Sequence, residues 1–270
     1  MAYEPGMDLA GGGRAGRLRG LSGKLPAWLL YFTLPIILLL VWKGADMLGY
    51  IKPYTMPSPE KVAATAIELV RNGKLVKHIV ASMERVLEGF FIALVSALAL
   101  GVGIGLSKRV DIFTTLVLQI LRPIPPIAWI PMAILWLGIG ETSKVFIIFL
   151  GAFFPILVNV VDGISGIDAK YFELASVYEI PRKKLILRVI LPGATPSIMT
   201  GVRVGLGNAW VCVVAAEMIA AVSGVGYMLS DGRSLSRPDI VILGMLVVGF
   251  VGKVMDDLVK WVRAKVLVWA

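Results

Sequence analysis

Charged residues, cysteine and histidine are all scarce in this 270-residue chain, and each scarcity excludes something. Only 17% of the residues are charged and 57% are hydrophobic, whereas soluble proteins average about 25% charged and about 45–50% apolar residues. The single cysteine, Cys212, excludes an intramolecular disulfide. The single histidine, His78, has no ligand partners at metal-binding spacing, so we expect no metal site. The composition predicts an integral membrane protein.

Positive charge is in excess, with 27 Lys and Arg against 18 Asp and Glu. In a soluble chain this excess would suggest nucleic acid as a partner. Here the basic residues flank apolar runs, where Lys and Arg set the orientation of a membrane protein. We therefore expect the lipid bilayer, and no nucleic acid, as a partner. A signal peptide is not expected, because the first apolar run is too long and no small-residue cleavage site follows it.

About six apolar runs are long enough to cross a membrane, since each helical crossing needs roughly 20 mostly apolar residues. They cover residues 27–48, 86–106, 112–137, 145–161, 197–222 and 240–258. The third run is interrupted by prolines at 123, 125, 126 and 131. These prolines are expected to bend the segment, and they either widen a water-lined cavity or only kink the helix.

Clusters of Lys and Arg precede the first run and follow the second, fourth and sixth runs. Six crossings would place all these clusters on one side, so we expect both termini in the cytoplasm. Residues 1–25 are then a disordered cytoplasmic tail, and 26–270 a single membrane domain. The loop 50–82 disagrees, because it would be external and yet is rich in lysine, but long loops follow the rule poorly. Within it, Ser58 and Pro59 are expected to start a short amphipathic helix.

A polar and basic segment, residues 168–192, separates the fourth and fifth runs and cannot lie in hydrocarbon. Asp168 is a suitable N-cap for a helix of about two turns over Tyr171–Tyr178. Pro181 disfavours a helical conformation just before it and suits the start of a second helix at Arg182. We expect an amphipathic helix–turn–helix elbow on the cytoplasmic face, where another protein binds.

The run Glu173-Leu174-Ala175, followed by Leu191-Pro192, resembles the "EAA" loop of ABC-importer permeases. Further segments are similar to the nitrate, sulfonate, taurine and bicarbonate branch of that family: RPIPPIAWIP (122–131), WLGIGETSK (136–144), GVR (201–203) and AEM (216–218). The resemblance covers about Pro57 to the C-terminus. It implies an all-α type I importer permease with two permease chains, two ATP-binding subunits and an external binding protein.

The resemblance also implies that the elbow is a coupling helix that docks into the ATP-binding subunit. The expected coupling residues are Glu173, Leu174, Ala175, Ser176, Val177, Glu179, Pro181, Arg182 and Pro192. The chain departs from the family at Glu179, where the family has a glycine that ends the first helix in the left-handed conformation. We expect Pro181 to supply the break instead, and a basic residue of the partner to face the extra carboxylate.

Polar and aromatic residues within the spans are candidates for lining the translocation path. A charge at a helix centre costs about 2.5–3.5 kcal/mol and usually faces a cavity or a partner. The candidates are Trp129, Asn159, Arg203, Asn208, Trp210 and Glu217. Interhelical hydrogen bonding is the alternative for all of them, and it is favoured for Arg203 and Glu217. The glycines at 101, 103 and 105 have no preceding strand, so they predict close helix packing and not a dinucleotide loop.

The chain shows no nucleotide-binding loop, no paired carboxylates placed for acid–base work and no nucleophile with a base. We therefore expect a non-enzymatic permease without a cofactor of its own, with ATP and Mg²⁺ on the partner ATPase. The expected cargo is a small anion or organic solute, moved across the cytoplasmic (inner) membrane by alternating access, and a permease homodimer is favoured. A secondary transporter or channel is the alternative, for which Glu217 is the only candidate coupling carboxylate. A membrane-embedded enzyme or a scaffold fits less well.

Overall fold

The structure, a computed structural model, describes residues 27–50 and 55–267, in two compact units divided after residue 53. The first unit holds α1 (Ala27–Met47), a 21-residue helix over the first predicted span. It ends with Gly49 in the left-handed region, at φ 72°, which suits glycine. The predicted tail, residues 1–25, lies outside the described residues, and the predicted domain limits stay a prediction.

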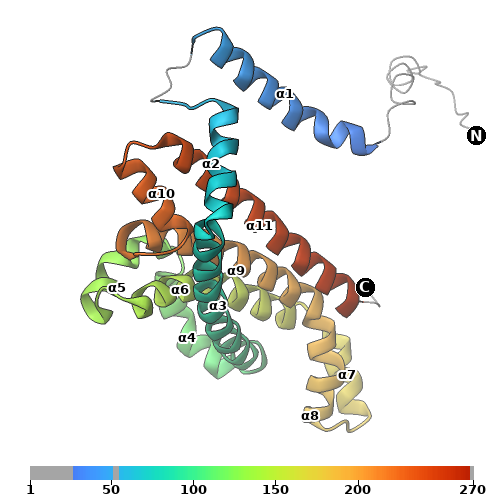
Figure 1. Ribbon diagram of the computed structural model, residues 1–270. Helices are drawn as coiled ribbons and strands as arrows, with labels where there is room; N and C mark the ends of the chain where they lie inside the picture. The colour runs from blue at the N-terminus through green and yellow to red at the C-terminus, as the bar shows by residue number, and fades with distance from the viewer. Residues whose placement is uncertain (1–26, 51–54, 268–270) are drawn as a thin grey trace, which may run out of the picture. The chain divides into compact units, whose positions relative to one another are not determined.

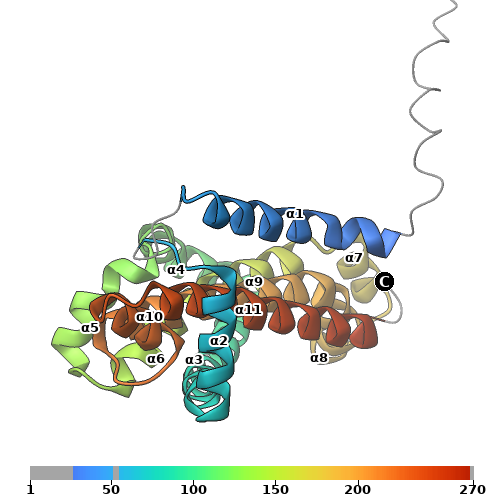
Figure 2. The ribbon, with the colours of Figure 1, turned by 45° about the horizontal axis from the view of Figure 1, so that its top comes forward.

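Helices make up the regular structure of the second unit, as far as the chain is described. They are α2 (Pro59–Arg71), α3 (Lys74–Leu106), α4 (Lys108–Leu121), η1 (Pro126–Trp129), α5 (Ile130–Leu137), α6 (Glu141–Ser165), α7 (Ala169–Val177), α8 (Arg182–Leu185), η2 (Ile186–Ile190), α9 (Leu191–Ala220), α10 (Val225–Ser234) and α11 (Pro238–Val266). The helices α3, α6 and α9 pack against one another (Figure 1). The helix α11 packs alongside α9 (Figure 2). The predicted all-α fold is confirmed.

Among the described residues, four helices are long and apolar enough to cross a membrane: α3, α6, the run Arg182–Ala220, and α11. A fifth crossing results if α4 and the segment Pro126–Leu137, which are bent by 84° relative to each other, count as one broken span. The bend lies at the prolines of the third predicted run, as expected. These five and α1 correspond to the six predicted runs, but a count of six is not confirmed.

Small residues let the helices of the core approach closely. A Cβ atom at Gly101 on α3 would lie 2.7 Å from Cγ1 of Val160 on α6, and one at Gly105 would lie 2.8 Å from Cβ of Ile164. The predicted helix packing is therefore confirmed at these two glycines. Gly103 meets no atom closer than 4.0 Å and takes no part in it.

The helix α2 begins as the sequence predicts. The Ser58 hydroxyl accepts a hydrogen bond from the N–H of Lys61 at 3.3 Å, and Pro59 occupies the first turn. The inner face of α2 packs on α11, where the Thr65 hydroxyl donates to Asp239 at 2.7 Å. An oxygen of the same Asp239 carboxylate accepts from Arg237 at 2.7 Å. This contact fastens α2 to the start of α11.

Candidate translocation cavity and coupling elbow

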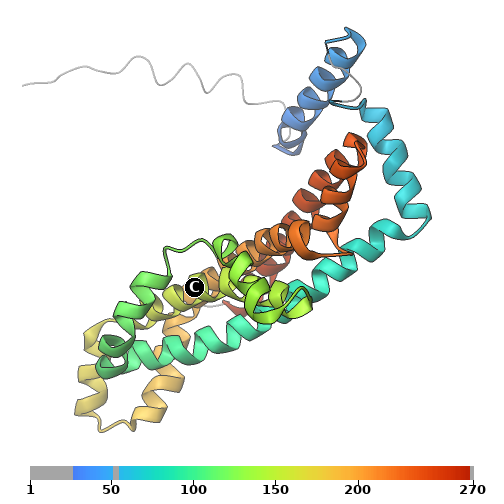
Figure 3. The same cartoon turned by 90° about the vertical axis from the view of Figure 1, so that its left-hand side faces the viewer.

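The predicted elbow projects from one end of the helical unit, and α10 lies at the other end (Figure 3). Asp168 caps α7 as predicted, because its carboxylate accepts the N–H of Lys170 at 2.9 Å. The helix α8 begins at Arg182, also as predicted. From there one helical run of 39 residues, Arg182–Ala220, continues through Pro192. The second arm of the elbow is therefore continuous with the fifth predicted span.

The helix α7 ends at Val177 and is capped by Tyr178, and the next residue, Glu179, adopts the left-handed conformation at φ 50°. The N–H of Ile180 donates to the carbonyl of Ala175 at 2.8 Å, and the N–H of Glu179 donates to Ser176 at 3.2 Å. These two bonds form a Schellman motif. The expectation that Pro181 replaces the glycine break is wrong, because the chain has already turned at Glu179. The left-handed conformation of the family glycine is kept, at a steric cost of roughly 1–2 kcal/mol for a residue with a Cβ.

Most of the predicted coupling residues are exposed on this elbow. The exposed members are Glu173, Leu174, Ser176, Val177, Glu179, Pro181 and Arg182, whereas Ala175 is buried and Pro192 is half-buried. Leu174 is 53% and Val177 is 77% exposed. Apolar side chains gathered on a projecting and otherwise basic segment are typical of a protein-binding surface.

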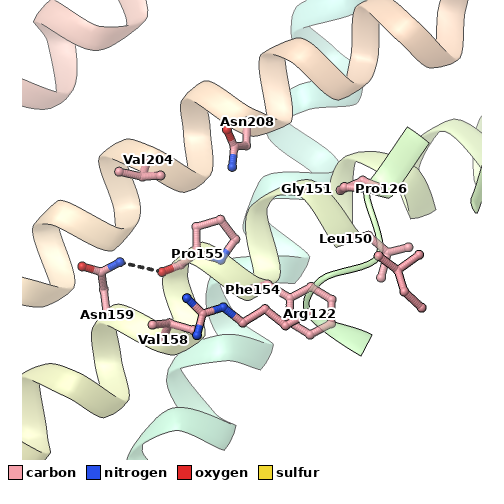
Figure 4. A pocket seen from close by; sticks show the side chains of 11 residues that line it. Arg122, Pro126, Leu150, Gly151, Phe154, Pro155, Val158, Asn159, Val204 and Asn208 are labelled. Carbon is pink, nitrogen blue, oxygen red and sulfur yellow. Dashed lines mark hydrogen bonds between the residues drawn. The ribbon is translucent and has the colours of Figure 1, made fainter. Parts of the chain in front are cut away.

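A cavity of about 350 Å³ lies between α6, α9 and the residues that follow α4 (Figure 4). It is lined by Arg122, Ile124, Pro126, Leu150, Gly151, Phe154, Pro155, Val158, Asn159, Val204 and Asn208. Two of the predicted path residues, Asn159 and Asn208, therefore meet at one hollow. The side-chain amide of Asn159 donates to the carbonyl of Pro155 at 2.8 Å.

Two prolines shape this cavity. Pro155 lies inside α6 and has no N–H to give the carbonyl of Gly151, one turn earlier. Both residues line the cavity. Pro126 also lines it, where the chain turns from α4 into η1. The proline-rich interruption of the third run thus borders a cavity. This agrees with the first of the two roles considered for these prolines, widening a cavity or only kinking the helix.

Arg122, the first residue of the motif RPIPPIAWIP, also lines the cavity, although it was not among the predicted path residues. It directly follows α4 and precedes the first of the interrupting prolines. A basic residue between an apolar helix and a proline turn is the signal that identifies it.

Three other predicted path residues lie elsewhere. Trp210 is buried, and its indole N–H donates to the carbonyl of Val248 on α11 at 3.0 Å. Arg203 pairs with Asp256 of α11, with 3.0 Å between Nη2 and Oδ2. Trp129 packs against the buried cluster around Ile147. Trp210 and Arg203 make interhelical hydrogen bonds, which was the alternative considered for them, whereas Trp129 makes an apolar contact.

Glu217 lies in a network of side chains that we call the outer clasp: Ser82, Arg85, Glu141, Glu217 and Ser223. Glu217 is 1% exposed, and its carboxylate accepts from Arg85 Nη1 at 2.7 Å and from the Ser82 hydroxyl at 2.8 Å. The N–H of Gly226 donates to it at 2.9 Å. The carboxylate of Glu217 therefore makes hydrogen bonds between helices, the role favoured for it from the sequence. Glu217 does not line the cavity.

Arg85 joins the remaining members of the outer clasp. Its Nη2 donates to Glu141 at 3.0 Å and to the Ser223 hydroxyl at 2.9 Å, and its Nη1 donates to the Ser223 carbonyl at 2.7 Å. Lys144 pairs with Glu141 at 2.8 Å. The clasp thus connects α3, α6, α9 and the turn before α10 through charge-assisted hydrogen bonds, the stronger class of such bonds.

Comparison with known proteins identifies the family of the chain. Residues 89–268 match the family model described as "Binding-protein-dependent transport system inner membrane component". The putative aliphatic sulfonates transport permease of Bacillus subtilis is 38% identical over 242 residues, which cover 90% of this chain and 88% of that protein. The taurine transport system permease of Escherichia coli is 31% identical over 238 residues, or 86% of each chain. A structure of the MetNI methionine ABC transporter, in an inward-facing conformation, is similar with a TM-score of 0.58 at 17% identity, covering 71% of this chain and 97% of that one.

The chain therefore belongs to the binding-protein-dependent ABC transporter permeases. It falls within the sulfonate, taurine and bicarbonate branch that its motifs resemble. It is a multi-pass membrane permease subunit of an ABC importer, as predicted, and the secondary-transporter alternative is set aside. The structural match shows that the described helices adopt the fold of such permeases.

Proposed function

We propose that this chain forms the translocation pathway of an importer for a small anion or organic solute and passes movement to a separate ATPase through the elbow. The observation that carries the proposal is the continuity of the run Arg182–Ala220, which joins the exposed elbow to the helix that lines the cavity. A displacement of the elbow therefore moves the cavity wall.

The names of the relatives support the cargo class. They refer to aliphatic sulfonates, taurine and, for a relative from Synechococcus elongatus, bicarbonate. All three are compact solutes with an anionic group. In such a system the external binding protein selects the solute, and the permease supplies a path for what is delivered.

Coupling follows from the chemistry of the elbow. Leu174 and Val177 give apolar contact area, and the buried Ala175 holds the turn together from inside. Glu173, Ser176 and Arg182 supply polar contacts at the rim of this surface. We propose that a groove on each of two ATP-binding subunits receives one elbow, and that ATP and Mg²⁺ bind on those subunits.

The transport cycle is then one of alternating access in a dimer of this chain. ATP closes the ATPase pair, the elbows move with it, and the helices switch from inward-facing to outward-facing. The binding protein releases solute into the cavity, and hydrolysis resets the system. Each state must make different contacts at the elbow, since coupling requires a difference in interaction between the two states. Both termini lie in the cytoplasm, on the side of the elbow.

Replacing Val177 or Glu173 on the elbow tests the proposal. Val177→Asp places a charge in the apolar contact, and Glu173→Lys reverses a charge at its rim, so we expect loss of co-purification with the ATPase and loss of coupled ATP hydrolysis. Glu68→Lys, on the exposed face of α2, is the matched control and should leave both unchanged. Full recovery of the ATPase with both elbow variants would refute the docking surface.

Glu179 needs variants that separate its backbone conformation from its charge. Glu179→Asn and Glu179→Gly both relieve the left-handed strain and remove the carboxylate. Glu179→Gln removes the carboxylate and keeps the strain. If a basic residue of the partner meets Glu179, all three lower coupled ATPase activity. If only the turn matters, Asn and Gly raise thermal stability and leave coupling intact, which would contradict the proposed charge contact.

A further inference from the structure

Arg122 has no protein partner in the part of the chain that the structure describes. No ion pair reaches its guanidinium, and none of its side-chain nitrogens donates a hydrogen bond. Its backbone N–H alone is engaged, with the carbonyl of Leu118 at 2.9 Å. Figure 4 shows the side chain extending past Phe154 toward Val158 and Asn159. The guanidinium therefore offers free donors at the wall of the cavity.

The position of Arg122 along the chain makes this freedom informative. It follows 14 residues of helix that begin at Lys108, which corresponds to a rise of about 21 Å. The hydrocarbon core of a bilayer is only about 30 Å thick. An unpaired charge at that depth is costly in lipid, so such residues face a water-filled cavity or a ligand.

The groups around Arg122 suit an anion better than a cation. The cavity adds two carboxamides, Asn159 and Asn208, each of which carries N–H donors. No carboxylate lines it. Asp111 and Asp162 line an adjoining hollow of about 180 Å³ that Arg122 also borders, and neither of them forms an ion pair with it. Phe154, Val158 and Val204 complete an apolar wall, against which a charge is poorly screened.

A structural role at the end of α4 is the simplest competing explanation. Arginine near a helix C-terminus interacts favourably with the helix dipole. The guanidinium of Arg122, however, donates to none of the last carbonyls of α4. An interaction with the helix dipole would also not explain why Asn159 and Asn208, from two other helices, line the same cavity as Arg122.

We propose that Arg122 binds the anionic group of the translocated solute inside the cavity, with the amides of Asn159 and Asn208 as additional donors. This inference rests on the proposed function and adds that the path itself carries a counter-charge for its cargo. The ligand is an anion small enough for about 350 Å³, such as a sulfonate, nitrate or bicarbonate.

Cysteine labelling tests the local charge without knowledge of the substrate. Cys212, the only native cysteine, is buried and would be replaced by alanine. Val204→Cys then places a thiol on the cavity wall, in the whole permease–ATPase complex in vesicles. We measure the rate at which this thiol reacts with each of two methanethiosulfonates. One is anionic and carries an ethylsulfonate, and the other is cationic and carries a trimethylammonium. Arg122→Gln should lower the ratio of anionic to cationic rate about tenfold, the effect of one nearby charge at intermediate dielectric, and Arg122→Lys should retain most of it.

A thiol at Val70, which is exposed on α2 and does not line the cavity, is the matched control and should show no change of ratio with Arg122→Gln. Nitrate or ethanesulfonate in the aqueous phase should slow labelling at residue 204 in the parent and not in Arg122→Gln. If nitrate or ethanesulfonate slows labelling equally in vesicles of phosphatidylcholine alone and in vesicles with added phosphatidylglycerol, the bound anion is a free solute. Dependence on phosphatidylglycerol alone would assign Arg122 to a lipid headgroup and overturn the proposal, as would an unchanged rate ratio.

Uptake separates this inference from the proposed function. With binding protein and ATP, the parent should accumulate radiolabelled taurine, ethanesulfonate or bicarbonate, and Arg122→Gln should lose at least about tenfold of the rate while ATPase subunits still co-purify. Failure of the parent to transport any of them would count against the proposed cargo class, whereas equal uptake by parent and Arg122→Gln would overturn only the role of Arg122.

Discussion

Arg85 on α3 and Arg122 after α4 are two arginines of one helical unit in opposite environments. Arg85 is buried and donates to two carboxylates and to Ser223 in the outer clasp. Arg122 is exposed to a cavity and donates to no side chain that the structure describes. The two residues share a charge and a membrane setting, so the difference lies entirely in what the fold places around them.

This contrast separates a structural from a functional charge. Burying an ion is costly unless it is paired and hydrogen-bonded, and Arg85 meets both conditions. A charge left without partners contributes nothing to packing and is available to a ligand. Arg237 lies between these two cases, since it is half-exposed and has one carboxylate, that of Asp239.

Breaking the outer clasp should give the largest loss of stability. Glu217→Gln removes one of the two carboxylates of Arg85 and leaves a buried charge partly uncompensated, so we expect a loss of about 3–5 kcal/mol in the free energy of unfolding. Chemical unfolding of the purified protein in detergent measures it. The double variant with Arg85→Gln should recover part of the loss, because the two residues are directly coupled. Additive single losses would contradict a shared clasp.

Asp239→Ala should have an intermediate effect. It leaves the Thr65 hydroxyl in a buried site without its acceptor and frees Arg237 toward solvent, so we expect a loss of about 1–3 kcal/mol. Limited proteolysis between α2 and α3 should become faster, since the contact that fastens α2 to α11 is gone. A loss of stability as large as that of Glu217→Gln would show that the size of the loss does not depend on how deeply the paired arginine, Arg85 or Arg237, is buried.

Arg122→Gln should have the smallest effect on stability, within about 0.5 kcal/mol of the parent, as is usual for exposed positions that lack contacts. The same unfolding experiment measures it. A loss of stability similar to that of Asp239→Ala would mean that Arg122 has a structural partner in the assembled transporter, and the contrast with Arg85 would then fail.

Much of the fold follows from local features of the sequence. Ser58 and Asp168 were identifiable as helix N-caps, and each accepts the expected backbone hydrogen bond. The prolines of the third run predicted an interruption, which is present as an 84° bend. These features depend on neighbours within a few residues, so sequence patterns describe them well.

The candidate site could be predicted only in part. Asn159 and Asn208 meet at the cavity as path residues should, whereas Trp129, Arg203, Trp210 and Glu217 lie in contacts between helices. Residues in one apolar helix look equally suited to both roles, because the sequence shows the polarity of a residue and not the direction in which it points. Arg122 was missed for the same reason.

The sequence by itself determined that this chain is a membrane permease with a helix–turn–helix elbow, because hydrophobic length, cap residues and family motifs are all local signals. Tertiary structure alone decided which charges are satisfied. Arg85 and Glu217 are 132 positions apart and meet at 2.7 Å, while Arg122 meets no partner among the described residues. The physical reason is that the pairing of a charge depends on which helices lie side by side, and burial against distant segments makes that choice.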